Sequence, residues 1–323
     1  MKETMSDKHI RTLRHMCVKF NKFSLEELQA HIATLEEGNI YKDKFKTIQH
    51  RSGVAQKIES IGQEYRAAYM TKTWNKILTE YKQSEEWKDD KFVEPLRSMK
   101  LIQQWLKQNN CTPDFFNTLA NIIDRKLPKR NSITIVGPSN SGKTYFIQKP
   151  LQEIIRFVGQ VSNVNTNSQF AWQTCILSRL ISIDEALFAP EHLDKYKQIS
   201  GGEKCTVDKK FSTPVVITRT PVILTANVPP WRTNAAERTP LLNRTHYIQT
   251  SECPWLKDVI KDINPICFWA YHQATQHPGT NCDHFYTAAE AIVNSSTFTA
   301  TNNSTTPTTT TTRTIARAIP QQT

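Results

Sequence analysis

The sequence has no apolar run long enough to cross a membrane. A spanning helix needs about 18 or more apolar residues, and no stretch of this chain approaches that length. Residues 1–15 are charged where a secretory signal would be apolar. The seven cysteines are scattered singly and form no CxxC pair, which suits free thiols in a reducing compartment. These absences predict a soluble chain that is not exported.

The chain is not short of core-forming residues or of positive charge. With 323 residues, of which 38% are hydrophobic, it is too apolar to be wholly disordered, and its length suggests about two domains. Lys and Arg number 41 against 30 Asp and Glu, a net charge of +11, and the N-terminal part is the more basic. This balance is compatible with a polyanionic partner or with an ordinary solvated helical domain, so charge alone leaves the partner open.

Residues 1–125 are predicted to be helical. Ser24 and Glu27 form a capping box before an apolar helical face, which predicts a helix over about 24–38. Apolar residues at spacings of three and four predict further helices over about 53–84, over about 93–108 and from Thr112 onward. We interpret these faces as the core of a helix bundle.

The pattern changes near Leu127 and predicts a second domain over 126–280. Short β-branched runs alternate with helical stretches there, which is typical of an α/β fold. The predicted strands are Ser132–Val136, Arg179–Ile183, Pro214–Thr218, Pro221–Thr225 and Thr245–Ile248. Residues 281–323 are rich in threonine and poor in apolar residues, which predicts a disordered tail.

One motif carries specific chemistry. The sequence GPSNSGKT directly follows the first predicted strand and opens a helix; its residues are Gly137, Pro138, Ser139, Asn140, Ser141, Gly142, Lys143 and Thr144. Glycines let backbone N–H groups surround a phosphate, a lysine reaches the β and γ phosphates, and a hydroxyl serves Mg²⁺. The motif and its setting predict binding of a nucleotide, ATP, with Mg²⁺.

Acidic and amide side chains follow two later strands. Asp184 and Glu185 end the apolar run LISI; beside a phosphate loop, Asp184 suits Mg²⁺ and Glu185 suits the base that activates water. Asn227 follows the run TPVILTA and could position that water, although alone it could simply cap a turn. Two glycines and the lysines Lys209 and Lys210 predict a hairpin with a basic tip over 201–210, which suits DNA phosphates or an ordinary exposed loop.

Together, these motifs resemble a known family. The order GPSNSGKT, LISIDE, a glycine-pair loop ending VDKK, and TPVILTAN is similar to the superfamily 3 helicase domain of parvovirus non-structural replication proteins. The resemblance covers about residues 100–275. It implies an AAA-like P-loop ATPase core preceded by an all-helical domain, whose C-terminal part would be an oligomerisation bundle. It also implies an ATP-dependent DNA helicase that works in viral DNA replication in the host nucleus.

The resemblance further implies partners and individual roles. The chain would form a ring of identical subunits, with single-stranded or forked DNA passing the basic hairpins. By motif position, Gly137, Gly142, Lys143 and Thr144 would bind the phosphates and Mg²⁺, and Asp184 and Glu185 would serve the metal and the water. Asn227 would be the polar sensor. Lys210 or Lys209 would contact DNA, and Arg244 would be the arginine finger.

Four features depart from that pattern or stand outside it. Some relatives have a second hairpin lysine where this chain has Ser212, and Pro150 should end or kink the helix after the phosphate loop. No His-x-His pair occurs anywhere in the sequence, so the nicking activity of full-length relatives is not expected. The metal-ligand types Cys267, His272, His277, Cys282 and His284 lack the spacing of a familiar zinc module, and a helix end with a loop is favoured.

Two other functions remain compatible with these residues. A phosphate loop also occurs in kinases and nucleotide-binding regulators, but these need neither a basic hairpin nor an arginine acting on a neighbouring subunit. A scaffold with a defective ATPase could bind DNA, but it would be expected to lose Lys143 or Glu185.

Overall fold

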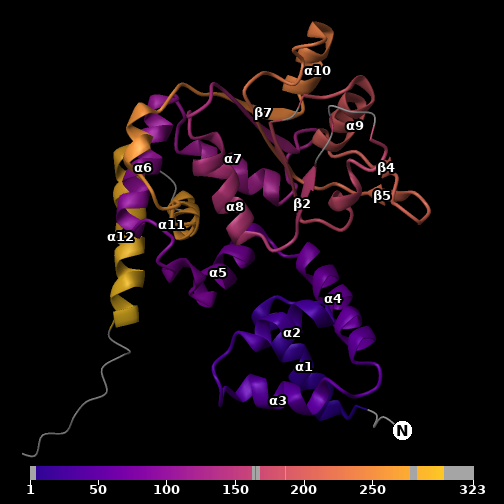
Figure 1. The fold of residues 1–323 in the computed structure, drawn as a ribbon. Helices are drawn as coiled ribbons and strands as arrows, with labels where there is room; N and C mark the ends of the chain where they lie inside the picture. The colour runs from indigo at the N-terminus through magenta and orange to yellow at the C-terminus, as the bar shows by residue number, and fades with distance from the viewer. Residues whose placement is uncertain (1–4, 162–163, 165–167, 186, 277–281, 302–323) are drawn as a thin grey trace, which may run out of the picture.

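The computed structural model describes residues 5–161, 164, 168–185, 187–276 and 282–301. Four N-terminal helices form a lobe of their own, and the rest of the chain builds a parallel sheet flanked by helices (Figure 1). Within the described residues, no helix combines the length and apolar character that a bilayer span requires.

The N-terminal lobe has its own small core. Its helices are α1 (Asp7–Phe20), α2 (Leu25–Ala33), α3 (Ile40–Ile48) and α4 (Val54–Met70). Apolar residues from all four pack together, among them Leu13, Leu28, Phe45 and Ile58. The backbone N–H of Glu27 donates to the Ser24 hydroxyl at 3.1 Å, as the capping box predicts, although α2 ends at Ala33.

Four later helices share one core with the sheet. They are α5 (Trp74–Ser84), α6 (Pro95–Gln108), α7 (Asp114–Ile123) and α11 (Ile266–Thr275). Their side chains, including Trp105, Leu119 and Phe268, pack with Ile133 of the sheet. The predicted boundary at 125 therefore does not separate two cores. The apolar faces of α5–α7 pack against the sheet and share its core.

The predicted tail from residue 281 is wrong for residues 282–301. They form α12 (Cys282–Thr301), which runs beside α6 along one side of the molecule (Figure 1). Tyr286, Ala289 and Val293 recur at helical spacing and are buried in the core that includes α11. The threonine-rich composition conceals this apolar face; residues 302–323 lie outside the described residues.

The central sheet has five parallel strands in the order β2-β3-β6-β1-β7. The strands are β1 (Ser132–Val136), β2 (Val158–Val161), β3 (Leu180–Asp184), β6 (Val222–Ala226) and β7 (Thr245–Gln249). Alternate residues face opposite cores: Ile133 and Ile223 pack with α5–α7 and α11, whereas Val222 and Leu224 pack on the other side with α9 (Pro190–Ser200). The predicted α/β fold is confirmed, and β2 was not predicted.

The helix after the phosphate loop passes Pro150 without ending there. Residues Thr144–Gln148 form a π-helical turn, and α8 (Lys149–Ile154) follows it directly. Pro150 lies in the first turn of α8, and the helix continues past it to Ile154. The prediction that Pro150 would end this helix early is therefore wrong. The departure from α-helical geometry is the π-helical turn, which precedes the proline.

The other elements are short. A separate antiparallel hairpin consists of β4 (Cys205–Val207) and β5 (Val215–Ile217), and α10 (Arg238–Leu242) precedes β7. Single 3-10 turns lie at Glu86–Lys88, Gln173–Cys175, Ala235–Glu237 and Pro254–Asp258.

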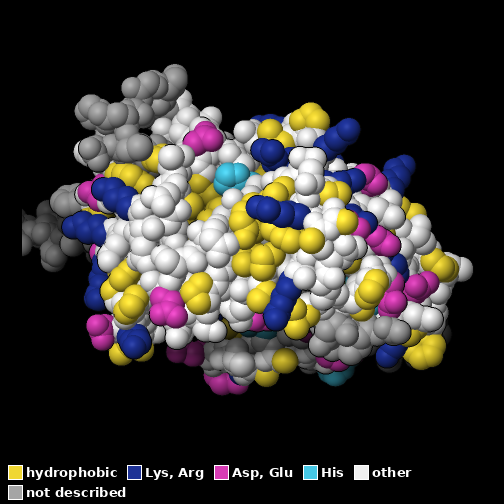
Figure 2. Space-filling model, turned by 90° about the horizontal axis from the view of Figure 1, so that it is seen from above, with side chains coloured by type: hydrophobic (Ala, Val, Ile, Leu, Met, Phe, Trp, Pro, Cys, Tyr) yellow, Lys and Arg dark blue, Asp and Glu magenta, His cyan; other side chains and the backbone are white. Residues whose placement is uncertain are grey.

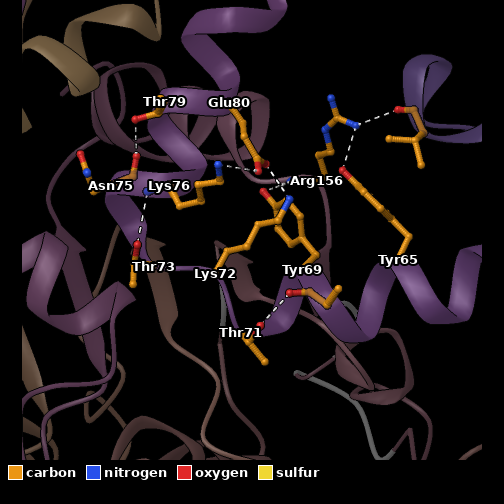
Figure 3. A network of polar contacts seen from close by, with 12 residues as sticks. Tyr65, Tyr69, Thr71, Lys72, Thr73, Asn75, Lys76, Thr79, Glu80 and Arg156 are labelled. Atoms are coloured by element: carbon orange, nitrogen blue, oxygen red, sulfur yellow. Dashed lines mark hydrogen bonds and ion pairs between the residues drawn. The ribbon is translucent and has the colours of Figure 1, made fainter. Parts of the chain in front are cut away.

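A polar network joins the N-terminal lobe to the sheet domain (Figure 3). Arg156, just beyond α8, donates to the Val18 carbonyl of α1 at 3.2 Å and to the Tyr65 hydroxyl of α4 at 3.3 Å. Its backbone N–H donates to the Tyr69 hydroxyl at 3.3 Å. The lobe is thus attached at the end of the helix that begins with the phosphate loop.

Arg179 makes a second connection, inside the protein. It is 1% exposed and donates to the carbonyls of Ile123 at 2.7 Å and Lys72 at 3.0 Å, with Asp124 at 3.9 Å. Burial, together with the charge of nearby Arg125, lowers the pKa of Arg179 to about 10, although the carboxylate of Asp124 acts in the opposite direction. One buried guanidinium therefore ties β3 to the end of α7 and to the α4–α5 turn.

We expect Arg179→Met to destabilise the protein by about 3 kcal/mol, because two carbonyls and a carboxylate lose their buried partner. The free energy of unfolding from urea titrations measures this. Arg66→Met is the matched control, since Arg66 is exposed over the Phe157 ring and should cost only about 0.5 kcal/mol. Equal losses in the two variants would contradict the role of Arg179.

Candidate nucleotide site

The phosphate loop leaves the carboxyl end of β1 and is tightly enclosed. A Cβ atom at Gly137 would lie 2.1 Å from the Thr250 hydroxyl oxygen and 2.5 Å from its carbonyl oxygen. Gly142 has φ +77° and a Cβ there would meet the Phe146 ring at 2.6 Å. Both positions require glycine, Gly142 for its backbone conformation as well, so the loop has the curled form that binds phosphate.

Lys143 projects into the loop rather than into solvent. Its Nζ donates to the carbonyls of Gly137 at 2.9 Å and Pro138 at 2.8 Å, and lies 3.2 Å from the Ser141 hydroxyl. The side chain is 5% exposed. Burial lowers the pKa of Lys143, while the carboxylates of Glu185 and Asp184 raise it. A buried ammonium whose hydrogen-bond partners here are oxygen atoms is suited to binding phosphate oxygens.

Asp184 and Thr144 face each other across the mouth of the loop. The Thr144 hydroxyl donates to Asp184 Oδ1 at 3.4 Å. Thr225 of β6 also donates to Asp184, and its hydroxyl lies 2.6 Å from Gln148 Oε1. Hydroxyl and carboxylate oxygens are ligands that Mg²⁺ prefers, so the side chains predicted for the metal lie together and fit it.

Asn227 connects Lys143 and Glu185. Its Oδ1 accepts from Lys143 Nζ at 3.1 Å, and its Nδ2 donates to Glu185 Oε2 at 2.6 Å. Glu185 has φ +53°, an uncommon conformation for a residue other than glycine and one that occurs often at active sites. The predicted lysine, base and sensor thus form one hydrogen-bonded chain.

The strand order explains this convergence. The strand β6 lies between β1 and β3, and the phosphate loop, Asn227 and the Asp184–Glu185 pair come at the carboxyl ends of these three neighbours. In open parallel sheets, ligands bind at that edge. The site residues predicted from separate motifs therefore come together because the fold aligns their strands.

Arg244 lies at the opposite edge of the sheet. It directly precedes β7, and its carbonyl accepts from the Asn131 N–H and the Ser132 hydroxyl, both at 3.1 Å, at the amino end of β1. Its guanidinium donates to the Pro240 carbonyl at 2.8 Å and is 3.8 Å from Glu203. The full length of β1 separates Arg244 from the phosphate loop of its own chain.

Lys209 and Lys210 lie apart from this site. They belong to residues 208–214, which connect β4 and β5, and both side chains are exposed. The hairpin projects from the molecule beside α9 (Figure 1). A hairpin with Lys209 and Lys210 in its connection is present, as predicted, but it spans 205–217 rather than 201–210, and the two glycines lie before it, at the end of α9. The hairpin is not hydrogen-bonded to the five-stranded sheet.

Several supporting residues were not predicted. The Trp105 indole N–H donates to the Ser141 carbonyl at 2.8 Å, so α6 holds the loop from below, and the Thr250 hydroxyl lies 3.0 Å from the Ser141 hydroxyl. Thr225 contacts Asp184 directly, and Gln148 contacts Thr225. The spacing of Gln148, four residues after Thr144 on the same helical face, is a signal that could have indicated it.

The possible zinc ligands do not assemble among the described residues. Cys267 and His272 are both buried in α11. His277 lies outside the described residues, as do the side chains of Cys282 and His284. In the part of the chain that the structure describes, no three His, Cys, Asp or Glu side chains are placed to hold a metal ion.

The sequence profile of the family described as parvovirus non-structural protein NS1 matches residues 5–248. The chain belongs to this family. Membership of the NS1 family, with its superfamily 3 helicase region, implies nucleotide binding, which agrees with the geometry around Lys143.

Two relatives in the NS1 family are each matched over 65% of the chain. Initiator protein NS1 of Diatraea saccharalis densovirus is 25% identical over 227 residues, 65% of this chain and 41% of that protein. Initiator protein NS1 of Junonia coenia densovirus is 25% identical over 226 residues, with the same coverage. The chain therefore spans about two fifths of the length of these curated relatives, and no nuclease region is aligned with it.

Solved structures support the fold. A JCV helicase bound to an acetamide compound superposes with a TM-score of 0.60 at 11% identity, covering 91% of this chain and 94% of that one. A second JCV helicase structure gives 0.58 at 10% identity, covering 90% and 93%. The predicted fold, an α/β core preceded by helices, is thereby confirmed and is similar to that of these helicase structures.

Proposed function

We propose that this chain is an ATP-dependent DNA helicase of superfamily 3 that acts in viral DNA replication in the host nucleus. It would hydrolyse ATP at the subunit interfaces of a ring. The observation that carries this proposal is the meeting of Lys143, Thr144, Asp184, Glu185 and Asn227 at the carboxyl ends of three adjacent strands.

Each of these side chains has a role that its contacts support. Lys143 would exchange its carbonyl partners for the β and γ phosphates of ATP. Thr144 and Asp184 would hold Mg²⁺, which supplies neutralisation of phosphate charge. Glu185 would accept a proton from the water whose oxygen attacks the γ phosphorus, as the bond to the β–γ bridging oxygen breaks. Asn227 would hold the Glu185 carboxylate in position for that transfer.

The position of Arg244 supports catalysis across a subunit interface. In a head-to-tail ring, each subunit contacts its two neighbours through two different surfaces. Arg244 is too far from its own loop to act there, whereas it could reach the γ phosphate held by a neighbour and stabilise the charge of the transition state. Seen from above, the surface has Lys, Arg, Asp and Glu side chains scattered among apolar ones (Figure 2).

Steady-state ATP hydrolysis with and without single-stranded DNA tests the proposal, together with gel filtration in ATP and Mg²⁺. We expect DNA to stimulate hydrolysis and the nucleotide to favour multimers. Hydrolysis that is indifferent to DNA in a monomeric protein would instead favour a kinase or a regulator. DNA binding without hydrolysis would favour a scaffold.

A further inference from the structure

The tip of the β4–β5 hairpin presents an aromatic ring to solvent. The Phe211 side chain is 105% exposed, the most exposed large apolar side chain among the described residues. Its backbone has φ +56°, a region that bulky residues seldom occupy. Burying a phenylalanine is normally favourable, so neither packing within the chain nor backbone preference accounts for this placement.

The groups around Phe211 are mainly basic. Lys209 and Lys210 directly precede it and are exposed, and Lys210 Nζ lies 5.7 Å from the centre of the Phe170 ring. The acid of this loop, Asp208, is 3.9 Å from Lys195 of α9, so part of its charge is offset. The tip therefore combines an uncovered ring with positive charge.

The hairpin is connected to the nucleotide site through α9 and β1. The helix α9 lies between the Asp184–Glu185 pair and the hairpin in the chain, and Tyr196 of α9 is hydrogen-bonded to Thr134 of β1 at 3.0 Å. β1 leads directly into the phosphate loop. A ligand bound at the hairpin tip would thus be linked to the phosphate loop through α9 and β1.

We propose that Phe211 stacks on a base of single-stranded DNA while Lys209 and Lys210 contact its phosphates. Single-stranded DNA is the partner that offers both exposed flat rings and a regular line of negative charge, and proteins bind it by combining aromatic and basic side chains. The inference rests on the proposed DNA function and deepens it: the hairpin would grip bases as well as backbone. Stacking tolerates any sequence, since every base has a π face.

Binding of fluorescent oligothymidylate at several salt concentrations tests the stacking. We expect Phe211→Ala and Phe211→Leu to weaken binding by about tenfold and Phe211→Trp to restore it. The salt dependence should stay unchanged in these variants, whereas Lys210→Ala should reduce the slope by about 0.7. Ile260→Ala is the matched control, since Ile260 is 97% exposed elsewhere and should bind like the unchanged protein.

A 2-aminopurine base in the oligonucleotide gives an independent reading, because stacking on Phe211 would quench its fluorescence and Phe211→Ala would relieve the quenching. If the unchanged protein does not bind DNA at all, the proposed DNA function fails with the inference. If binding depends on Lys210 but Phe211→Ala or Phe211→Leu binds normally, only the stacking is overturned. Loss of binding to anionic vesicles in Phe211→Ala, with DNA binding intact, would overturn it in favour of a membrane contact.

Discussion

Replacing Lys143 with alanine is expected to reduce ATP hydrolysis by on the order of 10³-fold or more. The ammonium group lies among the loop carbonyls and Asn227 Oδ1, where it would meet the phosphates. A charge prepositioned in a site with little water contributes far more than one in solution. Single-turnover hydrolysis with saturating ATP and Mg²⁺ measures the chemical step directly.

Lys149→Ala is the matched control for this experiment. Lys149 begins the next helical segment, is exposed, and pairs with Asp262 at 2.8 Å, so its removal should leave hydrolysis within about twofold of normal. Circular dichroism checks that both variants are folded. If Lys143→Ala retained a tenth of the normal rate, the loop could not be the catalytic phosphate site.

Arg244→Ala is expected to reduce hydrolysis by about 10³- to 10⁵-fold, the range measured for arginine fingers in other nucleotide hydrolases. Because Arg244 and the phosphate loop lie at opposite edges of the sheet, the arginine should act on another subunit. Arg238→Ala is the control, since Arg238 is also basic and exposed on α10. Loss of activity in Arg238→Ala alone would assign the finger to that residue instead.

A mixing experiment separates action in trans from a structural effect. An interface works if one subunit contributes an intact loop and its neighbour an intact Arg244. When equal amounts of Lys143→Ala and Arg244→Ala proteins assemble at random head to tail, about a quarter of the interfaces meet that condition. Hydrolysis should therefore recover on mixing two inactive proteins. No recovery in rings that demonstrably contain both variants would refute catalysis across the interface.

The sequence predicts most strands of the sheet closely. The apolar runs of β1, β6 and β7 are bounded by turn residues and match the observed strands to within one residue. β2 has four residues, one of them Gly159, and pairs only with β3, so its pattern is too short and too weakly apolar to stand out. α12 was missed because composition was averaged over a segment whose first part has a buried face.

Some residues of the candidate site could likewise be predicted from the sequence, and others could not. Lys143, Thr144, Asp184 and Glu185 belong to local motifs whose spacing reflects chemistry, and they could be predicted. Thr225 could not, because its contacts with Gln148 and Asp184 arise from strand order. Trp105 supports the loop from another helix, and no spacing along the chain indicates such a contact.

The hydrogen bond from Trp105 to Ser141 limits how far the chain can be shortened without losing support for the phosphate loop. A piece of the chain that began at residue 126 would carry every motif residue, yet it would lack the indole that holds the phosphate loop and the helices that cover one face of the sheet. Motif boundaries and folding boundaries therefore differ in this protein. The shortest piece with an intact phosphate loop has to include α5, α6 and α7, whereas α1–α4 have a core of their own.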